Sequence, residues 1–234
     1  MLTQIIHYFQ TDSSQYWLYV WQHIYLSGIT LVIAMAIALP LGYIGSRIKA
    51  VAAFCTAFSQ VLRIIPSLAL LFLLIPFIGT GMTPALIALV VLALPPLLIN
   101  TILGFNEVSP LYKEVGTALG MSRQQLRRQI EIPLALPYIL NGIKLALVEI
   151  IASATLATYI GAGGLGTLIF TGLGLYDMTY VVIGGVSVAI LALLSMAGFD
   201  FLIRRARRYD EASYSIYTCS KTIWQKCGNS GLEF

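Results

Sequence analysis

The sequence has few charged residues and no cysteine pattern of the kind that binds metals. Only 10% of its 234 residues are Asp, Glu, Lys or Arg while 58% are hydrophobic, and this balance excludes an ordinary soluble domain. Cys55, Cys219 and Cys227 show no paired ligand spacing, so we expect neither a metal site nor a structural disulfide from them. The composition therefore indicates a membrane protein.

The sequence also lacks the residues that catalysis or ATP hydrolysis would require. No phosphate-binding loop of the form G-x-x-x-x-G-K-[ST] occurs, so this chain is not a P-loop ATPase. Its two histidines, His7 and His23, have no nearby carboxylate beyond Asp12, which argues against a membrane-embedded enzyme. We expect no enzymatic activity, no metal and no cofactor in this chain.

Five apolar runs are each long enough to cross a bilayer, which takes about 20 residues. The second run contains Pro66 and Pro76, and we interpret it as one kinked helix because cutting it at Pro66 would leave pieces of about 13 residues. Neighbouring helices must shield the backbone carbonyls that Pro95 and Pro96 leave free in the third run. The runs lie at residues 21–46, 51–77, 84–104, 138–160 and 178–203. The sequence predicts an all-α protein with a bundle of five transmembrane helices.

The positive charges predict the orientation of the bundle, because Lys and Arg accumulate in cytoplasmic loops. The N-terminal segment, the 79–83 turn and the 161–177 connection contain neither residue, and we place all three outside. The predicted division is an extracytoplasmic segment 1–20, a transmembrane domain 21–208 with a cytoplasmic loop at 105–137, and a polar, loosely ordered cytoplasmic tail 209–234. The N-terminus is then outside and the C-terminus inside. The net charge of +4 reflects this bias and indicates no nucleic-acid partner.

Aromatic residues gather just before and at the start of the first span. Tyr16, Trp17, Tyr19 and Trp21 could form a cage for a quaternary amine. Trp and Tyr at this position are ordinarily an interfacial belt. We interpret them as a belt in contact with the lipid bilayer.

Gly161, Gly163 and Gly166 have the G-x-G-x-x-G spacing of a dinucleotide-binding turn. They follow a candidate transmembrane helix rather than a strand, and no acidic residue stands about 20 positions later, so we reject that interpretation. These glycines, with Gly164, allow a sharp turn at positive φ or close packing. The apolar segment 167–175 is too short to cross and is expected to dip into the bilayer edge. The region is an external gate or a structural turn.

The long cytoplasmic loop predicts a helical hairpin. Pro110 opens a helix that Gly120 ends. Ser122 and Gln125 offer a capping box for a second helix, and we expect Pro133 to stop that helix. A DNA-reading helix-turn-helix is the alternative, but a hairpin tethered between two spans cannot easily enter a major groove.

The same loop resembles the E-A-A-x3-G-x9-I-x-L-P motif of ABC importer permeases. Val115, Gly116 and Ile132 depart conservatively from its Ala, Ala and Leu. The segments "IIPSLALLFLLIPFIG" and "ATLATYIGAGGLGTLI" resemble the osmoprotectant branch, whose members import glycine betaine, choline, carnitine or proline. The resemblance covers about residues 26–208. The resemblance assigns the following residues to coupling with an ATPase: Glu114, Val115, Gly116, Ala118, Leu119, Gly120, Ile130 and Pro133.

This resemblance implies the type I ABC importer permease fold in a bacterial inner membrane. It implies three partners: an ATP-binding subunit that holds ATP and Mg, an extracytoplasmic substrate-binding protein, and a second permease subunit in a homodimer or heterodimer. The function would be import of a small osmoprotectant by alternating access. The alternatives are a permease for another solute such as methionine, and an ATP-independent secondary transporter. Inverted repeats would favour the latter, and five spans do not divide into two halves.

Two charged residues lie inside the predicted spans. Counted from residues 51 and 138, Arg63 and Glu149 both lie about 17 to 18 Å deep. An isolated charge there costs at least ~2.5 kcal/mol, so we predict that they approach each other, within one subunit or across a dimer. The alternative is that Arg63 bonds carbonyls freed by Pro66 while Glu149 stays protonated. The candidate pathway or gate residues are Arg63, Pro66, Ser67 and Glu149, with Gly161, Gly163, Gly164 and Gly166 on the outer side.

Overall fold

The computed structural model describes residues 2–229, with side chains from residue 3 to residue 206. Every regular element in this part is a helix, as predicted. The elements are α1 (Leu2–Thr11), α2 (Ser13–Arg47), α3 (Lys49–Ile64), α4 (Ser67–Ile78), α5 (Met82–Asn106), α6 (Pro110–Ala118), α7 (Arg123–Leu126), the π-helix η1 (Arg127–Glu131), α8 (Ile132–Ala157), the 3-10 helix η2 (Thr158–Ile160), α9 (Gly166–Leu175) and α10 (Met178–Asn229).

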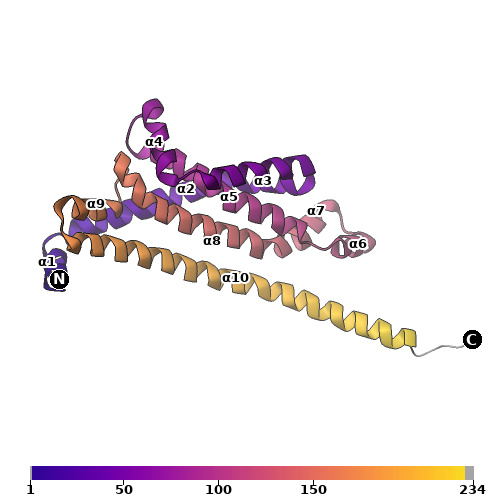
Figure 1. The fold of residues 1–234 in the computed structure, drawn as a ribbon. Helices are drawn as coiled ribbons and strands as arrows, with labels where there is room; N and C mark the ends of the chain where they lie inside the picture. Colours follow the sequence, from indigo (N-terminus) through magenta and orange to yellow (C-terminus); the bar gives the residue numbers. More distant parts are fainter. Residues whose placement is uncertain (1, 230–234) are drawn as a thin grey trace, which may run out of the picture.

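Helix α5 is the centre of the bundle, because it packs along α2 on one side and α8 on another (Figure 1). Small residues allow these helices to approach closely, as is usual in membranes. A Cβ on Gly42 of α2 would lie 2.7 Å from Thr101 Cβ of α5, and one on Gly142 of α8 would lie 2.7 Å from Asn100 Cβ. The central helix is therefore fixed by backbone proximity as well as by apolar side chains.

Four helices in the described chain are long and apolar enough to cross a membrane: Ser13–Arg47, Met82–Asn106, Arg123–Ile160 and Met178–Ala206. A fifth span exists if α3 and α4 count as one. The predicted single kinked helix is wrong, because α3 and α4 are separate helices bent by 94°. Pro66 explains the break: a proline forces the preceding residue out of the helical region, and Ile65 is extended at φ −73° and ψ 121°.

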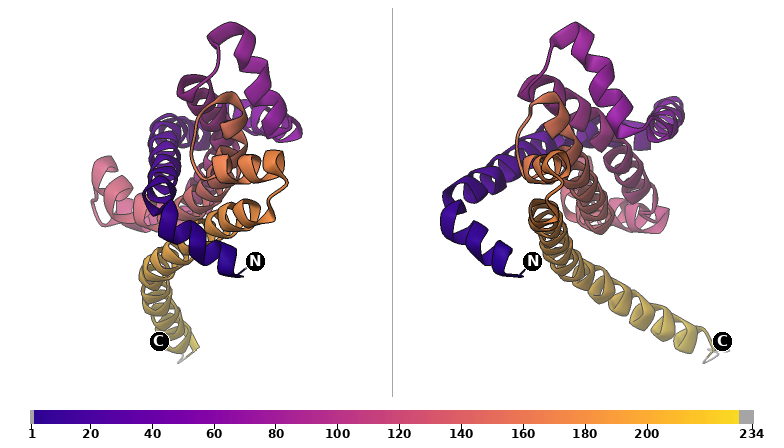
Figure 2. Two further views of the ribbon diagram at one scale, coloured as in Figure 1. Left: turned by 90° about the vertical axis from the view of Figure 1, so that its left-hand side faces the viewer. Right: turned by 60° about the vertical axis from the view of Figure 1, so that its left-hand side comes forward.

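Helix α4 projects away from the rest of the bundle, and α10 lies on the opposite side (Figures 1 and 2). Helix α10 continues as one helix to Asn229 and runs beyond the other helices. The tail that was expected to be loosely ordered is therefore helical as far as Asn229. The described chain thus has one face formed by α3 and α4 and another formed by α10.

The two ends of the bundle carry different structures (Figure 1). Helices α1 and α9 lie at one end, where Tyr16 and Tyr19 pack against a small apolar cluster that includes Leu168. Trp17 and Trp21 at this end are exposed, each with 66% of its surface accessible. Helices α6 and α7 lie at the other end. The two predicted sites, the glycine turn and the helical hairpin, are therefore at opposite ends of the bundle.

Candidate functional site

The hairpin of α6 and α7 has the turn chemistry that its sequence predicts. Ser109 caps α6, with Pro110 in the first turn. The helix ends at Ala118, and Gly120 follows at φ +79°. A Cβ on Gly116 would lie 2.5 Å from Leu126 Cδ1, so the two arms are in close contact. The prediction that Gly120 ends the first arm is confirmed.

The second arm begins with the predicted capping box. Gln125 donates its backbone N–H to Ser122 Oγ at 3.3 Å, and Ser122 donates its own to Gln125 Oε1 at 2.8 Å. The prediction that Pro133 stops this arm is wrong, since the chain stays helical from Arg123 to Ile160. The π-helix η1 ends at Glu131, two residues before Pro133, and its wider turn spares the proline ring from the clash of an ordinary helix interior.

The coupling residues that the motif assigns are mostly accessible. Glu114, Ala118 and Gly120 are exposed, and Leu119 has 77% of its surface accessible. Leu111 on the same arm is 52% exposed. The first arm therefore presents an apolar surface with a carboxylate beside it, at one end of the bundle and open to a partner.

Sequence reasoning missed the charge that joins this hairpin to the spans. Glu131, in η1, has only 4% of its side chain exposed. It accepts a very short hydrogen bond from Arg47 at the end of α2, and Lys113 of α6 lies 3.6 Å away. A buried carboxylate is retained where cations compensate it. The only signal in the sequence was an acidic residue inside the basic stretch "RRQIEIP".

Two stacked cations extend this cluster. The ring of Tyr43 on α2 lies 5.2 Å from the guanidinium of Arg47 and 5.1 Å from that of Arg127, within cation–π range. Phe105 of α5 meets the same ring edge-on at 5.0 Å. A cavity of about 520 Å³ between α2, α6, α7 and η1 is lined by Tyr43, Arg47 and Arg127, together with Lys113 and Glu131. These contacts join α6 of the hairpin to α2 and to η1, which leads into α8.

The outer glycines form the turn that their sequence predicts. Gly161, Gly163 and Gly164 have φ of +84°, +75° and +90°. Gly166 instead packs closely, since a Cβ there would lie 2.2 Å from the carbonyl oxygen of Thr155. Both predicted roles, turning at positive φ and close packing, are confirmed. The segment that follows is the helix α9, and its predicted dip into the bilayer stays a prediction.

This turn is held against α2 by Gln22, and the neighbouring His23 joins α2 to α8; sequence reasoning singled out neither residue for this role. The backbone N–H of Gly164 donates to Gln22 Oε1 at 3.1 Å. His23 is only 1% exposed, and its Nε2 lies 3.1 Å from the carbonyl oxygen of Ile151 on α8. The turn between α4 and α5 joins as well, through a 2.5 Å hydrogen bond from Gly81 N–H to the Ile160 carbonyl. The glycine turn, helix α2 and the α4–α5 turn are therefore in contact at this end of the bundle.

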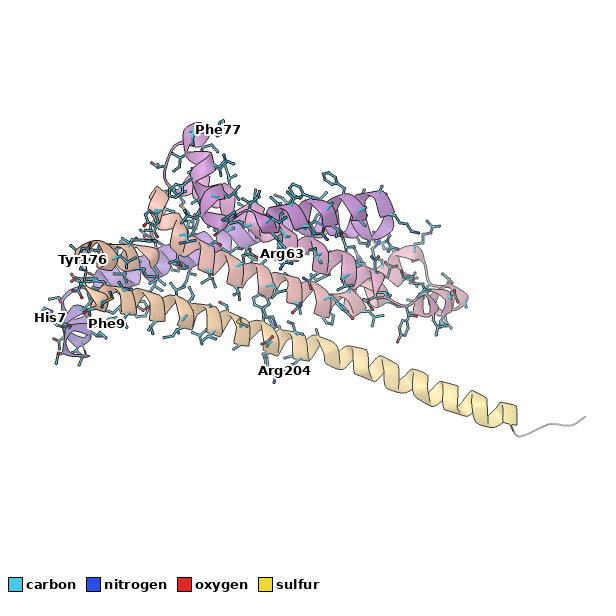
Figure 3. All side chains as sticks on the ribbon, viewed as in Figure 1. His7, Phe9, Arg63, Phe77, Tyr176 and Arg204 are labelled. Atoms are coloured by element: carbon cyan, nitrogen blue, oxygen red, sulfur yellow. The ribbon has the colours of Figure 1, made fainter. Side chains whose placement is uncertain are left out.

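Arg63 and Glu149 lie on the surface of the described chain. Arg63 is in the last turn of α3 and Glu149 is in the middle of α8, and both are exposed; Figure 3 shows Arg63 near the middle of the bundle's length. No ion pair within 4.0 Å joins them in the described chain. Arg63 also donates no hydrogen bond to a carbonyl freed by Pro66 among residues 3–206. Pro66 and Ser67 mark the break beside Arg63.

A bundle of apolar helices with an exposed helical hairpin between two of them is the fold of type I ABC importer permeases. The fold matches a chain of the MetNI methionine ABC transporter in an inward-facing conformation, with a TM-score of 0.73 and 24% identity over 84% of this chain and 99% of that chain. It also matches an amino acid ABC transporter at a TM-score of 0.67 and 18% identity, over 82% and 94%. The predicted type I importer fold is confirmed.

Residues 38–208 match the family described as the binding-protein-dependent transport system inner membrane component, and the chain belongs to this family. It is 42% identical to the carnitine transport permease protein OpuCB of Listeria monocytogenes, over 81% of this chain and 87% of that protein. It is 38% identical to the glycine betaine/carnitine/choline transport system permease protein OpuCB of Bacillus subtilis (strain 168), over 82% and 89%. The choline transport system permease protein OpuBB of that strain is 36% identical, over 87% and 92%.

Family membership confirms the predictions of an inner-membrane location and of a transport subunit. The family is one of permeases without a cofactor of their own, and no group of three or more His, Cys, Asp or Glu residues that could hold a metal occurs in the part of the chain that the structure describes. The predicted resemblance to the osmoprotectant branch is confirmed by the relatives.

Proposed function

We propose that this chain is the permease subunit of an ATP-driven importer of a quaternary-ammonium osmoprotectant such as glycine betaine, choline or carnitine. The relatives that share 36 to 42% of its residues over most of its length carry the names of carnitine, choline and glycine betaine transport permeases. Methionine is the weaker alternative, because the match to the methionine transporter is 24% identical and concerns the fold.

ATP is hydrolysed on a separate subunit that also holds Mg, and the α6–α7 hairpin docks in a groove of that subunit. The observation that carries this proposal is the position of Glu131 between Arg47 of α2 and Lys113 of α6. When the ATP-binding subunits close, the hairpin moves, and this ion-pair cluster passes the movement to the spans. The two ends of the pathway then open alternately.

The glycine turn at the opposite end is the external gate. This assignment follows the absence of Lys and Arg from residues 1–20 and 161–177, which places that end outside the cell. The turn contacts α2 through Gln22 and the α4–α5 connection through Gly81, so a tilt of any of these helices displaces it. An extracytoplasmic substrate-binding protein delivers the substrate to this end.

A second permease subunit completes the pathway against the α3–α4 face. Helix α4 is bent by 94° from α3, and its Phe72, Leu73 and Phe77 are exposed by 42%, 61% and 80%. One face of α4 packs on α5 and α8 through Leu70 and Leu71, but a helix of 12 residues is too short to span a bilayer alone. A partner of the same fold, either a second copy or a sister subunit, covers it.

The test is transport by the assembled complex. The chain is expressed with its ATP-binding subunit and binding protein, and ATP-driven uptake of labelled carnitine, choline and glycine betaine is measured in proteoliposomes. The expected result is co-purification of the ATP-binding subunit and uptake that stops with a non-hydrolysable ATP analogue. If the permease alone takes up substrate when only an ion gradient is supplied, it is a secondary transporter instead.

A further inference from the structure

Arg63 and Glu149 are opposite charges that face the same side of the bundle without pairing. Lys144 of α8 points to α10, because its Nζ lies 2.7 Å from Asp200 Oδ1. Glu149 follows five residues later, so it points about 140° away from Lys144 around the helix. That direction is away from α10 and towards the side of the bundle on which α3 and α4 lie in Figure 1, and Arg63 is in the last turn of α3.

Contact with the hydrocarbon core of the bilayer is energetically unfavourable for these two charged side chains. Charged groups inside a membrane face a bundle interior or a water-filled cavity rather than hydrocarbon. Both are exposed in the isolated chain, so in the assembled transporter they must face the aqueous pathway or the second permease. They stand on the same face as the projecting helix α4, which we assign to the second permease. The exposed charges therefore lie where the pathway passes between the subunits.

The break at Ile65 and Pro66 leaves the guanidinium of Arg63 uncovered and free to bind a ligand. Because α3 ends at Ile64 and α4 turns away by 94°, no following helical turn covers the side chain. Its guanidinium has five N–H donors, and none is used by a described residue. Glu149 likewise has no hydrogen bond or ion pair in this part of the chain. The two complementary charges are thus both unsatisfied here and more than 4.0 Å apart.

We propose that Arg63 and Glu149 bind the two ends of a zwitterionic substrate. The planar guanidinium of Arg63 binds the substrate carboxylate, the geometry that it matches in bidentate fashion. The carboxylate of Glu149 faces the quaternary ammonium, which has no N–H and is held by charge alone. Glycine betaine and carnitine offer both groups, whereas choline offers only the cation. This assignment rests on the proposed function, and it names which substrates need which residue.

A permanent ion pair between Arg63 and Glu149 would prevent both side chains from binding the substrate. Arg63 joined to Glu149 would satisfy both charges and leave nothing for a carboxylate or an ammonium group to bind. A separated pair instead stays unsatisfied until a zwitterion enters between the two side chains. The predicted direct pairing of these residues is thereby replaced by pairing through the substrate.

The test compares substrates in the reconstituted complex. Arg63→Gln should raise the KM for glycine betaine and carnitine about tenfold or more, the size of a lost hydrogen bond between charged groups, and should change the KM for choline less than twofold. Glu149→Gln should raise the KM for all three. Arg63→Lys keeps the charge without the planar fork and should give an intermediate effect on the zwitterions.

Two control variants make the same chemical changes elsewhere. Arg204→Gln and Glu107→Gln alter exposed charges outside this pair and should leave every KM unchanged. Co-purification with the ATP-binding subunit shows that each variant is assembled. If Arg63→Gln fails to assemble it is replaced by Arg63→Lys, and Glu149→Gln is replaced by Glu149→Asp.

Equal losses for choline and the zwitterions in Arg63→Gln would overturn the proposal. So would full recovery of uptake when the charges are exchanged by Arg63→Glu with Glu149→Arg, because a substrate-binding pair would then present the wrong orientation to the pathway. A wild-type complex without ATP-driven uptake of any of the three compounds would reject the proposed function itself. This outcome differs from failure of the Arg63–Glu149 proposal, in which the wild-type complex still takes up substrate.

Discussion

At the residue scale, removal of the Glu131 charge is expected to impair transport more than stability. It is nearly buried between Arg47 and Lys113, which are 42% and 32% exposed. Because those cations still reach water, solvent screening limits the loss of stability in Glu131→Gln to about 1–2 kcal/mol, below that of a fully buried pair. Transport should suffer more than stability, since the link from hairpin to span is lost.

Glu131→Gln is therefore expected to uncouple ATP hydrolysis from uptake. The measurement is the number of substrate molecules taken up per ATP hydrolysed in proteoliposomes, which should fall at least several-fold while ATPase activity persists. Glu107→Gln, at the exposed end of α5, is the matched control and should keep the ratio. An unchanged ratio in Glu131→Gln would show that movement is transmitted elsewhere.

A second residue-scale prediction concerns close packing at the outer turn. Gly166→Ala would place a Cβ 2.2 Å from the Thr155 carbonyl oxygen, so backbone must shift; overpacking of this kind costs about 1–3 kcal/mol. Gly174→Ala in the same helix meets nothing within 4 Å, and alanine there should be neutral or stabilising. Thermal unfolding of the detergent-solubilised complex measures both. Equal melting temperatures for the two variants would contradict the packing argument.

At the element scale, the hairpin depends on the backbone of Gly120. Its φ is +79° and its surroundings are open, since a Cβ at this position would meet no atom within 4 Å, so only backbone strain decides what is tolerated. Gly120→Val and Gly120→Asp should distort the turn and lower both co-purification of the ATP-binding subunit and uptake, while membrane insertion is kept. Gly120→Asn should retain most of both, because asparagine visits the left-handed region more readily.

The outcome that would count against this role is normal assembly and uptake in Gly120→Val. Insertion is followed by the amount of protein in washed membranes, which should match that of the unaltered chain in all three variants. A variant lost from the membrane would report on folding of the spans instead, and the comparison with Gly120→Asn separates the two effects.

The element scale also shows where sequence patterns were sufficient. The capping box of Ser122 and Gln125, the helix end at Gly120 and the turn at Gly161 follow from local rules, because each depends on residues a few positions apart. The single kinked helix was wrong because a run of apolar residues specifies burial in lipid but not direction. The bend at Pro66 depends on what the chain packs against on either side.

At the scale of the whole molecule, α4 and α10 lie on opposite sides of the bundle (Figures 1 and 2). If a second permease covers α4, Phe77→Cys should form a cross-link between permease subunits with a short bis-maleimide. Leu194→Cys on α10 is equally suited in exposure, at 66% against 80% for Phe77, and should form none. Native cysteines are replaced beforehand, and the product is detected as a dimer band on denaturing gels.

Expression with and without a sister permease, which itself carries a single cysteine at the position equivalent to Phe77, gives this experiment a second readout. A dimer band from the chain expressed as the only permease would indicate a homodimer, and a band that requires a sister subunit would indicate a heterodimer. Cross-linking from Leu194→Cys alone would place the interface on α10 and would overturn the assignment of the pathway to the α3–α4 face.

The sequence by itself determined what is local or compositional. Few charges and long apolar runs specify helices in a membrane, and the spacing from Glu114 to Pro133 indicates the importer family. Only the tertiary structure decided which distant residues meet. Arg47 and Glu131 are 84 residues apart, and Gln22 and Gly164 are 142 apart. No periodicity predicts such contacts, since they arise from how α2, α5 and α8 pack together, and the same packing leaves Arg63 and Glu149 unpaired on one face.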